Sequence, residues 1–93
     1  MGLKYKETKE GLAITGYDGK IIDLVIPDAI DGIPVVAIDD RAFEYCHSLK
    51  SIKFPNSITK IGNYAFFFCL GLEEIKLPRN LKSIGDYAFM NVS

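Results

Sequence analysis

Residues 49–71 read LKSIKFPNSITKIGNYAFFFCLG and residues 72–93 read LEEIKLPRNLKSIGDYAFMNVS, so the second stretch repeats the first at a step of 23. Ala-Phe pairs keep the same step, at residues 42–43, 65–66 and 88–89. A repeat of this length is typical of a solenoid, in which each coil buries its apolar side against the next coil.

Each coil begins with a short segment that has the alternation of a β-strand. Ile52 and Phe54 alternate with Ser51 and Lys53, as in a strand with one buried face, and Pro55 ends the strand because it has no N–H to donate. Stacked coils would place equivalent strands side by side in a parallel sheet, about 4.8 Å apart.

An irregular coil precedes the regular ones. Residues 21–30 match residues 49–58 at a step of 28, which is five residues more than the regular period. The additional residues lie around Asp31-Gly32-Ile33-Pro34. Asp-Gly favours a tight turn and Pro34 cannot donate to a β-ladder, so we expect a surface excursion there.

The first twenty residues do not follow the repeat and predict a β-hairpin cap. Residues 3–8 and 12–17 have strand composition and are joined at Lys9-Glu10-Gly11; a second hairpin signal at Asp18-Gly19 leads into residues 20–26. Such a cap would shield the first coil, and its many charged side chains suit a surface that faces solvent.

The expected architecture is therefore one mainly β domain, a short leucine-rich-repeat solenoid of 23-residue coils behind a hairpin. The cap covers residues 1–20 and the solenoid residues 21–93. The solenoid comprises an irregular first coil (21–48), a regular coil (49–71) and an incomplete last coil (72–93).

The repeat resembles the BspA-like class of bacterial leucine-rich repeats. Its pattern is Leu-x-x-Ile-x-Leu-Pro-x-x-Leu-x-x-Ile-Gly-x-x-Ala-Phe-x-x-Cys, which residues 72–89 match almost letter for letter. The departures are Asp39 and Asp40 flanking the Gly column, Phe54 in the Leu column and Val92 in the Cys column. The resemblance implies an extracellular or cell-surface bacterial protein that adheres to host or bacterial proteins.

Composition excludes several other classes of function. Eleven basic residues against twelve acidic ones give a net charge of -1, so there is no electrostatic reason to expect nucleic acid as a partner. No apolar run is long enough to insert into a membrane, and the first residues lack the apolar core of a signal peptide.

Few residues suggest catalytic or metal chemistry. His47 follows Cys46, but neighbours in an extended coil point to opposite sides, which favours a surface histidine over a Cys–His dyad. Cys46 and Cys69 are compatible with a disulfide or half a metal site, but buried free thiols fit better. Asp39-Asp40 and Glu73-Glu74 are expected to be solvated. We predict no enzyme, no metal site and no cofactor.

Two surfaces are candidates for binding a protein. The first candidate is the set of outward positions on the repeat strands, and the alternative is that this face is merely soluble. These positions are Asp23, Val25, Ser51, Lys53, Glu74 and Lys76. Tyr45, Phe67 and Phe68 form the second, an aromatic patch whose alternative is rings tucked under the turn. Tyr64 and Tyr87 share a column beside Arg41, which is placed to lie over a ring.

The sequence leads to two hypotheses of function. The first is a non-enzymatic protein-binding or adhesion module that presents a leucine-rich-repeat surface. The second is structural, a capping segment at the N-terminal side of a longer repeat array, with function elsewhere or in self-association. Residues 72–93 stop before the next strand of the pattern, so we expect either a longer array or a partner, such as a second copy, on the last coil.

Overall fold

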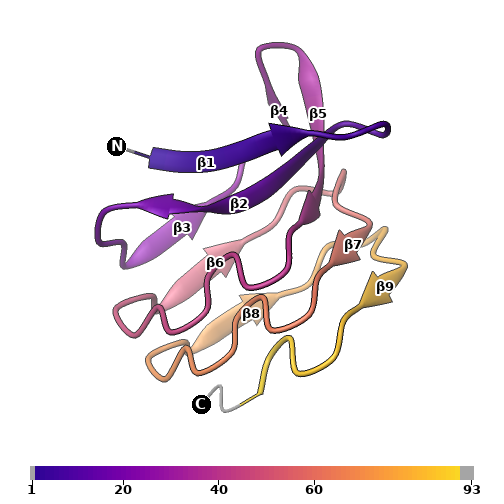
Figure 1. Ribbon diagram of the computed structural model, residues 1–93. Coiled ribbons are helices and arrows are strands. Elements are labelled where there is room, and N and C mark those ends of the chain that lie inside the picture. The colour runs from indigo at the N-terminus through magenta and orange to yellow at the C-terminus, as the bar shows by residue number, and fades with distance from the viewer. Residues whose placement is uncertain (1, 91–93) are drawn as a thin grey trace.

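The N-terminal segment folds back on itself before the repeat begins. In the computed structural model, which describes residues 2–90, β1 (Gly2–Glu7) pairs antiparallel with β2 (Leu12–Asp18). Thr8 closes the turn by donating its backbone N–H to the carbonyl of Gly11 at 2.7 Å. The hairpin lies across one end of the stacked coils (Figure 1), which confirms the predicted cap.

The prediction of a second hairpin after Asp18-Gly19 is wrong. β3 (Asp23–Val25) does not return along the cap but pairs in parallel with β6 (Ser51–Lys53) in a different sheet. The glycine of the turn, with a φ of 107°, lets the chain cross to that sheet. There Leu24 joins Ile52 in one buried column, and this apolar contact outweighs the local hairpin signal.

Two sheets form the walls of the solenoid (Figure 1). The first has the order β3-β6-β8, with β8 at Glu74–Lys76, and all of its pairs are parallel. The second has the order β1-β2-β5-β7-β9, with β5 at Ile33–Ile38, β7 at Lys60–Ile61 and β9 at Ser83–Ile84. Because β2 pairs in parallel with β5, the cap continues the ladder of the second wall.

The irregular first coil contains the expected surface excursion. β4 (Ala29–Ile30) pairs antiparallel with the start of β5 through Asp31 and Gly32. These two residues have φ values of 52° and 81°, as the tight turns of two-residue hairpins require. The five additional residues are thereby accommodated without disturbing the column of Ile38, which remains buried.

Aromatic rings stack through the core between the two walls. Phe66 has no exposed surface, and its ring lies 5.3 Å from Phe43 and 5.2 Å from Phe89, nearly parallel to both. Phe54, which replaces leucine in its column, packs edge-on against Phe66 at 5.9 Å. The repeated columns thus form continuous ladders, which confirms the predicted solenoid and the core position of Phe66.

A second ladder uses polar side chains, and it was not anticipated. Asp40 Oδ1 accepts the backbone N–H of Asn63 at 2.8 Å, and Asn63 Oδ1 accepts that of Asp86 at 2.7 Å. A Cβ atom on Gly62 would lie 2.6 Å from the backbone nitrogen of Asp40, and one on Gly85 would lie 2.5 Å from that of Asn63. The glycine column therefore exists because adjacent coils approach too closely for a side chain.

The described part of the chain contains no helix long and apolar enough to cross a bilayer. Val92, which occupies the Cys column in the repeat pattern, lies outside the described residues.

Candidate binding surfaces

The outward side chains of β3, β6 and β8 form a row along the first wall, named here the strand row. Its members are Asp23, Val25, Ser51, Lys53, Glu74 and Lys76. Parallel register places Val25, Lys53 and Lys76 side by side, and Ser51 donates its hydroxyl hydrogen to Asp23 Oδ1 at 2.7 Å. Val25 is 67% exposed, so an apolar side chain lies open beside Lys53, and Lys76 follows on the next strand.

The strand row is positively charged where β6 and β8 end, at Lys53 and Lys76. Lys53 and Lys76 are register partners, and no ion pair among the described residues involves either of them. A shallow depression of about 590 Å³ lies over β6 and β8. A second depression of about 410 Å³ is lined by Lys53, Lys76 and Arg79, with no acidic residue in its lining. This end of the row is therefore suited to acidic groups of a partner.

The rings of the predicted aromatic patch lie together. Phe67 and Phe68 stack at 4.5 Å, and Tyr45 packs edge-on against them at 5.8 Å and 5.6 Å. Tyr45 is 52% exposed, whereas both phenylalanines are half-buried. The structure thus brings the three rings into one cluster, of which the tyrosine contributes most of the exposed part.

Two further tyrosines extend this cluster along the solenoid. Tyr64 lies 5.1 Å from Phe67 and 5.3 Å from Tyr87. The guanidinium carbon of Arg41 lies 4.4 Å from the centre of the Tyr64 ring, and its Nη1 contacts Glu44 Oε2 at 2.6 Å. Arg41 therefore covers the ring in its column, as its position in the sequence indicated.

The backbone beneath these rings has a conformation that no sequence signal revealed. Four aromatic residues hold positive φ angles: Tyr45 (62°), Tyr64 (57°), Phe68 (58°) and Tyr87 (56°). Glycine and asparagine are the usual markers of this region, because a side chain with a Cβ is crowded there. The tight turns of successive coils impose this angle at equivalent positions. The angle could therefore be predicted only from the three-dimensional path of the coil, and not from residue types.

The cysteines are free thiols, and their surroundings oppose reactivity. Cys69 is buried and donates its S–H to the carbonyl of Phe43 at 3.0 Å. Burial raises the pKa of the Cys69 thiol to about 11 and also raises the pKa of Cys46. Because the thiolate is the nucleophile, raised pKa values are the reverse of what a Cys–His dyad needs. His47 is exposed and packs edge-on against Tyr45 at 6.3 Å.

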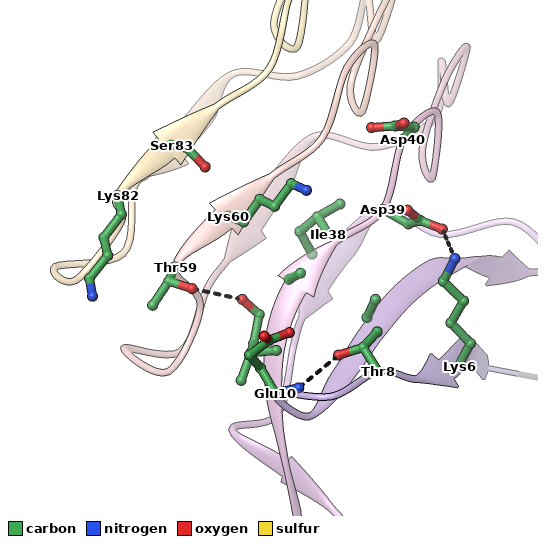
Figure 2. Close-up of a pocket in the computed structure, with 13 residues that line it drawn as sticks. Lys6, Thr8, Glu10, Ile38, Asp39, Asp40, Thr59, Lys60, Lys82 and Ser83 are labelled. Atoms are coloured by element: carbon green, nitrogen blue, oxygen red, sulfur yellow. Dashed lines mark hydrogen bonds and ion pairs between the residues drawn. The ribbon is translucent and has the colours of Figure 1, made fainter.

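A depression of about 540 Å³ lies on the second wall, between the cap and β7 and β9 (Figure 2). Lys6 reaches across from the cap to Asp39, with Nζ 3.1 Å from Oδ2. Asp40 is occupied by its contact with the Asn63 amide. These neighbouring carboxylates therefore hold the cap and the coils together. Within residues 2–90 no group of three or more His, Cys, Asp and Glu side chains is arranged to hold a metal ion.

Comparison with solved structures finds close matches among bacterial leucine-rich-repeat proteins. A leucine-rich-repeat protein of T. pallidum is 41% identical, with a TM-score of 0.92 over 96% of this chain and 42% of that one. A leucine rich cell surface protein of Faecalibacterium prausnitzii is 28% identical, with a TM-score of 0.81 over 99% of this chain and 28% of that one. The chain thus spans less than half the length of either protein.

A leucine-rich-repeat protein of Bacteroides ovatus is 26% identical, with a TM-score of 0.66 over 99% of this chain and 32% of that one. Among curated proteins no match was found. The model of the BspA type leucine rich repeat region matches residues 17–93, in six copies. The buried ladders, the parallel strands and this match agree, and the chain belongs to the BspA-type leucine-rich-repeat family.

Proposed function

We propose that the chain is a non-enzymatic protein-binding or adhesion module whose binding surface is the strand row. The observation that carries this proposal is the exposed apolar side chain of Val25 in register with two lysines that have no described counter-ion. An exposed apolar side chain next to one lysine, with a second lysine on the following strand, is a combination that protein interfaces use to bind apolar and acidic groups of a partner.

The rigidity of the strand row also supports this role. Each of its strands is bonded to its neighbour in continuous parallel register, so the outward side chains keep fixed spacings. A partner that binds such a surface loses little free energy in ordering it. Loops would not offer the same advantage, since they must be ordered when the partner binds.

The proposal includes a location at or outside the bacterial surface, which one relative supports. The F. prausnitzii relative is a leucine rich cell surface protein, and this chain aligns with it over 99% of its own length. We propose that this protein acts at the surface of a bacterium or outside it, where host and bacterial proteins are the available partners.

A structural role is the second candidate. The β1–β2 hairpin covers the first coil and extends the ladder of the second wall, as a cap of a longer repeat array would. Under this alternative the chain stabilises an array, and the binding work resides in other coils.

An array of purified extracellular-matrix and plasma proteins, probed with the labelled chain, tests the proposal. A Lys53→Glu, Lys76→Glu double variant should bind its ligand at least tenfold more weakly, because two cations of the strand row become anions. The matched control is Lys60→Glu, Lys82→Glu, which reverses two exposed lysines next to the second wall.

Equal losses in the two double variants would exclude the strand row as the binding surface. A folded chain that binds no protein of the array would contradict adhesion to matrix and plasma proteins and favour the structural role. Circular dichroism spectra of the variants, compared with that of the native chain, distinguish a loss of binding from a loss of folded structure.

A further inference from the structure

The strand row consists of two columns of opposite charge. The column at the start of the strands is acidic and comprises Asp23, Ser51 and Glu74. The column at their ends, named here the basic column, comprises Val25, Lys53 and Lys76. The acidic column repels an acidic segment of a partner, and the basic column attracts it. Such a segment therefore follows the basic column along the stack of coils, and does not run parallel to the strands.

The two lysines of the basic column repel each other in the free protein. Lys53 and Lys76 are register partners on strands that lie about 4.8 Å apart, and like charges in such positions oppose strand pairing. No ion pair among the described residues relieves this repulsion. A carboxylate placed between the two ammonium groups would replace the repulsion with two attractions. Lys53 is exposed although β3 and β8 pair with its strand on either side, so this site lies on the lateral face of the solenoid.

A third cation lies beside the same pair of lysines. Lys53, Lys76 and Arg79 are the charged residues that line the depression of about 410 Å³ described above. Arg79 is exposed, and no ion pair among residues 2–90 involves it. A guanidinium can bind a carboxylate through two parallel hydrogen bonds, which gives the contact a preferred geometry as well as charge. The depression therefore favours a carboxylate that reaches it from the basic column.

The distance from Val25 to the lysine pair sets the spacing of the groups that can bind together. A point midway between Lys53 and Lys76 lies one and a half strand spacings from Val25, about 7 Å along the column. In an extended segment, a residue and the next but one point to the same side and lie about 6.7 Å apart. Adjacent residues point to opposite sides, so they cannot make both contacts.

We propose that the basic column binds an extended segment of the partner protein in which an apolar residue and an aspartate or glutamate are separated by one residue. The apolar side chain covers Val25, and the carboxylate lies between Lys53 and Lys76, within reach of Arg79. This inference rests on the function proposed above, because it takes the strand row as the binding surface. It adds the chemistry and the spacing of the segment that is bound.

An array of synthetic peptides with blocked ends, probed with the labelled intact chain, tests this inference. Each peptide carries one leucine and one glutamate in a background of glycine, serine and threonine, and the number of residues between the two is varied from zero to three. Binding should be strongest with one intervening residue, by about tenfold over adjacent placement, because only then are both contacts made. Glutamine in place of glutamate should remove this preference.

Variants of the chain assign each half of the motif. Arg79→Gln should weaken the preference for glutamate over glutamine, since a fork of donors is lost. Val25→Lys extends the row of cations, so this variant should prefer a second glutamate to leucine at the same spacing. The matched control is Lys82→Gln, which removes an exposed lysine next to the second wall and should leave both preferences unchanged. Circular dichroism spectra verify that each variant is folded.

The outcomes separate this inference from the function on which it rests. Suppose that the Lys53→Glu, Lys76→Glu variant loses binding to a protein of the earlier array, while peptide binding is independent of spacing and of glutamate. The acidic segment is then wrong, and the strand row remains the binding surface. Binding of heparin that requires Lys53 and Arg79 but not Val25, without binding of the peptides, would overturn the segment in favour of an anionic polysaccharide. A folded chain that binds neither peptides nor proteins would overturn both proposals.

Discussion

Phe66→Ala should lower the free energy of unfolding by about 4–5 kcal/mol. Truncating a buried phenylalanine to alanine costs roughly 3–5 kcal/mol, from lost burial and from the cavity that remains. Phe66 belongs at the upper end of this range because it has no exposed surface. Its ring also contacts three others, those of Phe43, Phe54 and Phe89. The coils on either side are held by their own backbone ladders, so they cannot collapse fully into the space.

Urea unfolding followed by circular dichroism measures this loss. A chain of this length has a total stability of about 5–14 kcal/mol, so the alanine variant could fail to fold. In that case Phe66→Leu replaces it, with an expected cost of about 1–2 kcal/mol. Phe89→Ala is the matched control. The ring of Phe89 is half-buried, so its removal should lower the free energy of unfolding by less. A loss below about half a kcal/mol for Phe66→Ala would remove this residue from the core and refute the stacked-coil packing.

Three further outcomes test other features of the fold. Gly62→Ala should destabilise the chain by about 1–3 kcal/mol in the same urea assay, because its Cβ would contact the backbone of Asp40. Asn63→Ala should lower the free energy of unfolding by about 0.5–1.5 kcal/mol, since the N–H of Asp86 loses its acceptor. Thermal melting measures this loss, and an unchanged melting temperature would refute a stabilising polar ladder. The pKa of Cys69 is raised in the fold, so the folded state holds its proton more tightly. Stability should therefore fall as pH rises from about 9 to about 11, and Cys69→Ala should remove that part of the slope.

Most of the fold could be predicted because a solenoid repeats one physical constraint. Each apolar column must lie over the equivalent column of the next coil, so spacing alone aligned Phe43, Phe66 and Phe89. The Asp31-Gly32 turn was equally readable, because few residues other than Asn, Asp and Gly tolerate its φ angles.

The parts that could not be predicted depend on long-range geometry. The path after Asp18-Gly19 was misjudged because a local turn signal does not reveal which sheet will receive the next strand. The positive φ angles at Tyr64 and Tyr87 have no marker in the sequence, since the coil imposes them on residues that rarely adopt them.

The candidate surfaces were predictable in position but not in role. Alternation along each strand was enough to identify the outward residues of β3, β6 and β8, and the structure places them in one row. Which protein they bind is a matter of charge and shape on exposed side chains, which the packing of the core does not constrain.

Lysine footprinting of the chain bound to its ligand from the protein array tests the central claim most directly. Acetylation followed by mass spectrometry compares each lysine in the free and the bound chain. The account predicts protection of Lys53 and Lys76 in the strand row, while Lys60 and Lys82 next to the second wall remain reactive. Protection of Lys60 and Lys82, with Lys53 and Lys76 unchanged, would contradict the strand row as the binding surface.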